Sequence, residues 1–231
     1  MTATHLQPAL AARRWGVIAA ATLSGILVMV SMFIDPVPSA NGRELIEGYA
    51  ENSVRAGLHT NLIHYGFALL APVVFAIVGL VRGRGAALAN LAGVTAVIGL
   101  TTLPGLVMLD LTGTAAAQVT DIDTAYAIEE QLGQNPAFVF LVIPAFLCAM
   151  VVVPLAVIAM WRARLVHGSF AVSGVLAAVA LHVAPTWWLA FGINLVWMMA
   201  LGYVLWRLPL PLWDRSPAPA EPATSPVATG V

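Results

Sequence analysis

Long apolar stretches recur along this chain, and they constrain its fold more than any other feature. Each approaches the ~20 residues that a helix needs to cross a hydrocarbon core about 30 Å thick. The stretches occupy 15–34, 59–81, 86–109, 137–161, 169–184 and 187–206. The sequence therefore predicts an all-α, polytopic membrane protein with six transmembrane helices in three hairpins.

The composition excludes a water-soluble globular domain. Charged residues make up 9% of the 231 residues and hydrophobic residues 60%, whereas soluble domains carry about 25% charged residues. A polar coat cannot be made from so few charges. The only cysteine, Cys148, lies inside an apolar stretch, which excludes an intramolecular disulfide and a cysteine-based metal or redox motif.

Arginines predict the orientation in the membrane, because positive residues concentrate in cytoplasmic segments. If the stretches alternate in direction, one side holds Arg13, Arg14, Arg82, Arg84, Arg162, Arg164, Arg207 and Arg215, whereas the other holds only Arg43 and Arg55. Both termini are therefore predicted to be cytoplasmic. The absence of lysine and the abundance of alanine, valine, glycine and proline favour a bacterial source, and hence the bacterial cytoplasmic (inner) membrane.

Two polar segments on the opposite side are patterned for helices along the membrane surface. In 41–58, Asn41 and Glu44 are spaced as a capping box. The apolar faces consist of Ile46, Tyr49, Ala50, Val54 and Leu58 in 41–58, and of Ile122, Ala125, Tyr126 and Leu132 in 112–136. We expect two short extracytoplasmic amphipathic helices.

The termini divide the chain into three parts. Residues 1–12 form a short cytoplasmic segment, and 13–208 form the transmembrane domain. The first apolar stretch is longer than that of a signal peptide, and Pro38 occupies the −3 position of the one plausible cleavage site, so the stretch is expected to be retained. Residues 209–231 are rich in proline and alanine and predict a disordered cytoplasmic tail.

Polar residues gather where the second stretch begins, within LHTNLIHYGFALLAP (58–72). His59 lies at the predicted outer boundary, and His64 lies about 7 Å deeper along the helix. His182 enters from the fifth stretch at a similar depth. The predicted site is an outer-leaflet polar pocket lined by His59, Asn61, His64, Asp110 and His182.

Histidines on facing helices also allow a different chemistry. His64 and His182 could hold a haem b between them, as in small membrane cytochromes, or they could simply form hydrogen bonds at the interface. His59 and His64 are separated by about 140° around a helix, so they do not form a metal pair by themselves. No metal site is predicted.

Other functional classes remain open. Asp35 and Asp110, with His64 and His182, could form a proton relay or a cation vestibule. A membrane cyclase would also use carboxylates that face an apolar cavity, but the sequence has no aspartate-rich motif. Helix-bending residues such as Pro72 and Pro104 allow a small-molecule transporter, but no predicted span carries a charge at its centre. Nucleotide-binding signatures are absent, and the net charge of −1 disfavours nucleic acid.

The stretches FIDPVP and ENSVRAGLHTNLIHYGFAL, with the arginine-bounded hairpins, resemble uncharacterised six-helix membrane proteins of actinobacteria, a domain of unknown function. The resemblance covers 13–207 and implies a fold but no catalytic residues. The favoured interpretation is a non-enzymatic binding or accessory component. Its expected partners are the lipid bilayer and either a second copy or another membrane protein. A membrane enzyme or cytochrome using the same histidines is the alternative.

Overall fold

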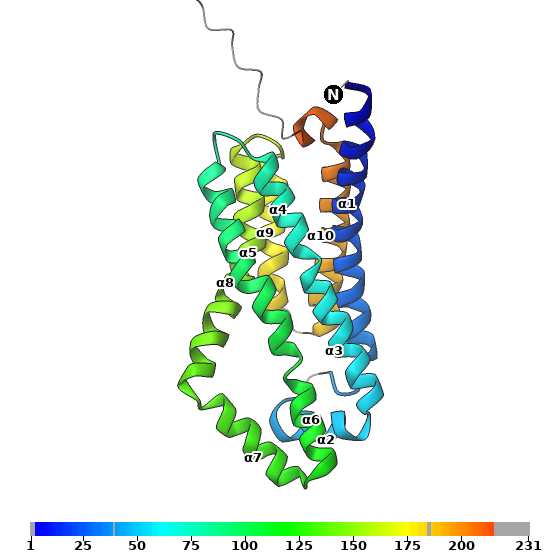
Figure 1. The fold of residues 1–231 in the computed structure, drawn as a ribbon, viewed down its shortest axis with the longest axis vertical. Coiled ribbons are helices and arrows are strands. Elements are labelled where there is room, and N and C mark those ends of the chain that lie inside the picture. Colours follow the sequence, from blue (N-terminus) through cyan, green and yellow to red (C-terminus); the bar gives the residue numbers. More distant parts are fainter. Residues whose placement is uncertain (1–2, 39, 184–185, 215–231) are drawn as a thin grey trace, which may run out of the picture.

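The structure is a computed structural model that describes residues 3–38, 40–183 and 186–214. Within these ranges the chain forms ten α-helices and one short 3-10 helix, without β-strands (Figure 1). The elements are α1 (Ala3–Ile34), α2 (Gly42–Glu51), α3 (Ser53–Ala68), α4 (Leu70–Leu80), α5 (Ala86–Val107), α6 (Asp110–Val119), α7 (Ile122–Gly133), α8 (Pro136–Arg162), α9 (Gly168–Val183), α10 (Trp187–Arg207) and η1 (Leu210–Trp213). The predicted all-α class is confirmed.

Five helical segments among the described residues are long and apolar enough to cross a membrane, which indicates a multi-pass membrane protein. They are Pro8–Ile34, Ser53–Leu80, Ala86–Leu103, Pro136–Arg162 and Trp187–Arg207. The second segment runs through α3 and α4, which adjoin at Leu69. α9 is apolar but has 16 residues, about 24 Å of helix, which is shorter than a hydrocarbon core of about 30 Å.

The long helices pack side by side as a closed ring. α1 contacts α3, α4 and α10; α10 contacts α9; α9 contacts α8; α8 contacts α5; and α5 contacts α3 and α4. Small residues allow the closest approaches: a side chain at Gly99 of α5 would collide with the backbone of α8 at Ala149, and one at Gly25 of α1 would lie 3.0 Å from Cβ of Met198 on α10. Helices in membranes associate through such small residues.

One end of the ring carries arginines. Nη1 of Arg13 donates to the carbonyl oxygen of Trp213 at 3.1 Å, and Nη2 of Arg82 donates to that of Asp214 at 2.7 Å. These bonds join the start of α1, the α4–α5 turn and η1. We call this region the arginine end.

At the opposite end, α2, α6 and α7 form a layer that we call the cap (Figure 1). Arg43 of α2 is paired with Asp123 of α7, and the α2 residues Ile46 and Tyr49 are buried. The cap differs in detail from the predicted surface helices. The first helix ends at Glu51 rather than 58, and 53–58 belongs to α3, with Val54 85% exposed rather than on a buried face.

The second surface helix is also divided differently. Its predicted core, with Ala125 buried, forms α7, which begins where Asp121 accepts a hydrogen bond from the backbone N–H of Thr124. The third predicted stretch runs to 109, but α5 ends at Val107 and Asp110 begins the separate helix α6. The cap therefore contains one helix more than the sequence predicts.

The sequence predicts disorder from 209, and this is wrong for 209–214. Residues 210–213 form η1, and the Trp213 side chain is 1% exposed. A large apolar side chain buried against the helices, together with the two arginine bonds to its backbone, holds this segment in place. Residues 215–231 lie outside the described part of the chain.

Candidate functional site

His59 is buried between α3 and α1. Its side chain is enclosed, and Nδ1 lies 2.8 Å from the carbonyl oxygen of Ser31. Because a carbonyl oxygen only accepts, Nδ1 carries a proton and donates this hydrogen bond. Nε2 faces Asp35, with 3.9 Å between it and Oδ2.

Tyr49 brings α2 into the same cluster. The residue is 2% exposed, and its ring centroid lies 6.1 Å from that of His59. Burial, followed by the negative charges of Asp35 and Asp110, raises the pKa of Tyr49 well above its ordinary value, so the phenol stays protonated.

Asp110 approaches the cluster from the start of α6. Burial, followed by the negative charges of Glu129 and Asp35, raises the pKa of Asp110 to about 6. Burial also raises the pKa of Glu129 on α7. Both carboxyl groups line a cavity of about 180 Å³ between α5, α6, α7 and α8. We call this group of side chains the cap cluster; it consists of Asp35, Tyr49, His59, Asp110 and Glu129.

The five predicted site residues do not all belong to this cluster. His59 and Asp110 do, but Asn61 is exposed and its Nδ2 donates to the carbonyl oxygen of Gly57 on its own helix at 2.8 Å. His64 is half-buried, with its ring 5.2 Å from that of Tyr65 in an edge contact. Among the described residues, no group of three or more histidine, cysteine or carboxylate side chains is arranged to hold a metal ion.

His182 belongs to α9, but its side chain lies outside the described part of the structure. Leu181, which precedes His182, lines a central cavity. Ile63, which precedes His64, lines the same cavity. The pairing of His64 with His182, and a haem between them, therefore stays a prediction.

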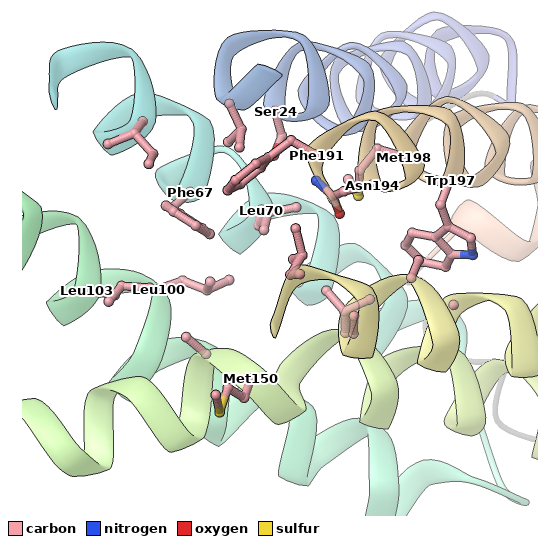
Figure 2. A pocket seen from close by; sticks show the side chains of 18 of the residues that line it. Ser24, Phe67, Leu70, Leu100, Leu103, Met150, Phe191, Asn194, Trp197 and Met198 are labelled. Atoms are coloured by element: carbon pink, nitrogen blue, oxygen red, sulfur yellow. The ribbon is translucent and has the colours of Figure 1, made fainter. Parts of the chain in front are cut away.

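The central cavity lies inside the ring of helices and has a volume of about 320 Å³ (Figure 2). Seven helices contribute to its wall, namely α1, α3, α4, α5, α8, α9 and α10. Most of the wall is aliphatic or aromatic, with Phe67, Phe146 and Phe191 among the lining residues, and none of the lining residues is charged. This volume lies within the range of small-molecule pockets, about 300–1,000 Å³.

Trp197 forms part of the wall because α9 offers a glycine opposite it. A Cβ atom at Gly174 would lie 2.5 Å from Cζ2 of the indole, so only glycine leaves room for the ring. The ring also stacks on Phe170, with 5.6 Å between centroids and 26° between planes. Nε1 of Trp197 is buried and has no hydrogen-bond partner among the described residues.

Two further polar side chains belong to the wall, Ser24 of α1 and Asn194 of α10 (Figure 2). Ser24 is 2% exposed and Asn194 is half-buried, and the described structure shows no hydrogen bond for either side chain. The sequence prediction missed these residues because it searched the spans for charges. An asparagine in the middle of a 21-residue apolar helix was the available signal.

Comparison of the chain with protein-family models, with curated proteins and with solved structures finds no match.

Proposed function

We propose that this chain is a non-enzymatic membrane protein that binds a small apolar molecule in the central cavity. The observation that supports this is the cavity itself, of about 320 Å³, walled by seven helices and without a charged lining residue. An engineered apolar cavity of about 150 Å³ stays dry and binds benzene. A cavity of twice that size is suited to an apolar body of about twelve heavy atoms.

The proposal moves the binding site from the predicted polar pocket to the middle of the ring. His59 is engaged by Ser31 and faces Asp35, and Asn61 is bonded to its own helix, so these side chains already have partners. The lining of the central cavity offers no acid, base or nucleophilic thiol with which to transform a ligand. Binding without chemistry is therefore the function we favour.

We further propose six spans, with α9 as the fifth, and both termini in the cytoplasm of a bacterium. α9 packs between α8 and α10 in the ring, which supports its place among the spans despite its length. The support for the orientation is the set of arginines at the arginine end, because positive residues favour the cytoplasmic side. The cap would then lie outside the cytoplasm.

The test uses naphthalene, an uncharged fluorescent probe with ten heavy atoms. The purified full-length chain in lipid nanodiscs should bind naphthalene above the level taken up by empty nanodiscs. Ala178→Phe, which places a ring in the cavity, should abolish that excess. Ala19→Phe is the matched control, because Ala19 is an exposed residue of α1. No excess binding by the native chain, or equal binding by both variants, would refute the proposal.

The same preparation tests the cytochrome alternative. A haem held by His64 and His182 would give a visible Soret absorption band in protein purified from cells supplied with haem. Loss of such a band in His64→Ala would establish the cytochrome in place of the binding protein proposed here.

A further inference from the structure

We infer that the ligand of the central cavity is an uncharged molecule with one hydrogen-bonding group, and that Asn194 and Ser24 form hydrogen bonds with this group. The inference rests on the proposed function and deepens it from an apolar ligand to a neutral amphiphile. The class consists of phenols, alcohols and ketones of about a dozen heavy atoms, or the end of a longer lipid of that kind.

The first reason is the unsatisfied state of Asn194. Its amide carries two donors and an acceptor, and none has a partner among the described residues. A polar group in an apolar cavity within a membrane is costly unless it is hydrogen-bonded. A ligand with a hydroxyl or carbonyl group removes that cost, whereas a hydrocarbon leaves it in place.

The second reason is that the polar groups lie together on one side of the cavity. α1 and α10 approach each other closely at Gly25, where a Cβ atom would lie 3.4 Å from Cα of Leu195. Ser24 precedes Gly25, and Asn194 precedes Leu195, so both polar residues lie next to this contact. Asn194 and Trp197 are three residues apart and therefore share a face of α10. The remaining wall, from α3, α4, α5, α8 and α9, is apolar.

The third reason concerns charge. None of the residues that line the cavity is acidic, basic or a histidine. An ion would lose its hydration on entering and would meet no opposite charge, which is strongly unfavourable in a low-dielectric interior. Carboxylates and amines of the same size are therefore excluded from the ligand class.

Three probes that share the same two fused rings test the inference. Naphthalene, 2-naphthol and 2-naphthoate differ only in the group attached to the two rings. In nanodiscs at pH 7, with uptake by empty nanodiscs subtracted, 2-naphthol should bind the native chain about three- to tenfold more tightly than naphthalene, as one additional hydrogen bond provides. 2-Naphthoate should bind more weakly than either.

Variants at the polar side chains locate the effect. Asn194→Leu should reduce the preference for 2-naphthol over naphthalene, measured as the ratio of the two affinities, to within about twofold, and Ser24→Ala should reduce it in part. Retained naphthalene binding shows that a variant is folded. If 2-naphthol and naphthalene bind the native chain equally, or if both variants keep the full preference, the inference is wrong although the proposed function stands. If no probe binds, the proposed function itself is wrong.

Discussion

The imidazole of His59 on α3 donates its Nδ1 proton to the carbonyl oxygen of Ser31 on α1, across 2.8 Å. Ser31 lies in the last turn of α1, and its carbonyl also accepts from the backbone N–H of Asp35 at 3.0 Å. The histidine thus ties the second long helix to the point where the first ends. The bond determines which nitrogen faces Asp35, and it explains a buried histidine without any bound ligand.

Replacing His59 should therefore destabilise the chain. His59→Ala removes a buried hydrogen bond and leaves a void between α1 and α3, for which we expect a loss of about 2–4 kcal/mol in the free energy of unfolding. Thermal unfolding in nanodiscs measures the loss. Asn61→Ala, at an exposed site on the same helix, should change stability by less than about 0.5 kcal/mol. Equal effects of the two substitutions would contradict the structural role of His59.

Asp110 should make the stability of the chain depend on pH. Its pKa is raised from 3.8 to about 6 in the folded chain, so between these values the folded chain binds more protons than the unfolded chain. The contribution of Asp110 to stability is then largest below about pH 4 and falls, by roughly 1–3 kcal/mol, as the pH rises to 6. Melting curves from pH 4 to 7 measure this slope.

Asp110→Asn should flatten that slope and be more stable than the native chain at pH 7, because it removes the cost of burying a charged carboxylate and also the repulsion from Glu129 and Asp35. Asp121→Asn is the control, because the pKa of Asp121 is shifted in the opposite direction to that of Asp110. Hydrogen bonds from Thr124 lower the pKa of Asp121, so its contribution is lost as the pH falls. A slope unchanged by Asp110→Asn would show that another group titrates.

Asn194→Leu should stabilise the chain in the absence of ligand. The substitution keeps the approximate size of the side chain and removes an amide without a hydrogen-bond partner among the described residues, so we expect a gain of about 1–2 kcal/mol. Thermal unfolding of ligand-free protein measures the gain. Asn90→Leu, at an exposed position of α5, should have little effect. If Asn194→Leu lowers the stability of the chain, the amide of Asn194 already has a hydrogen-bond partner.

The proposed orientation can be tested with introduced cysteines. In a Cys148→Ala background, Ala127→Cys on α7 should react with a membrane-impermeant maleimide on intact cells, whereas Arg84→Cys in the α4–α5 turn should react only after lysis. Both positions are exposed in the structure, so a difference reports the side of the membrane. The reverse pattern would overturn the orientation.

Much of the helical layout could be read from the sequence, because apolar length and helical spacing are local properties. The predicted stretch 137–161 corresponds to α8, Pro136–Arg162, and 187–206 corresponds to α10, Trp187–Arg207. The boundary near Asn52 was harder to predict. Polar residues suit both a surface helix and the start of a span, and the break depends on how α2 packs against α6 and α7 within the cap.

The site depended on contacts between helices that no single stretch reveals. Asp35 lies in the α1–α2 connection, Tyr49 on α2 and His59 on α3, and they meet because α3 packs against both α1 and α2. Asn61 lies two residues after His59 on the same helix, about 200° around its axis, and it faces outward. Which of these residues is buried follows from the rotation of α3 against α1, and not from residue type.

By itself the sequence determined that this is a helical membrane chain and approximately where most of its helices lie, because the hydrophobic effect and the length of a span act on each segment separately. The tertiary structure decided that Trp213 packs against the bundle and that Asn194 faces a cavity. Those outcomes depend on close approaches at residues such as Gly25 and Gly99. Small residues set the distance and rotation between neighbouring helices, and only that geometry determines which side chains meet and where space remains between them.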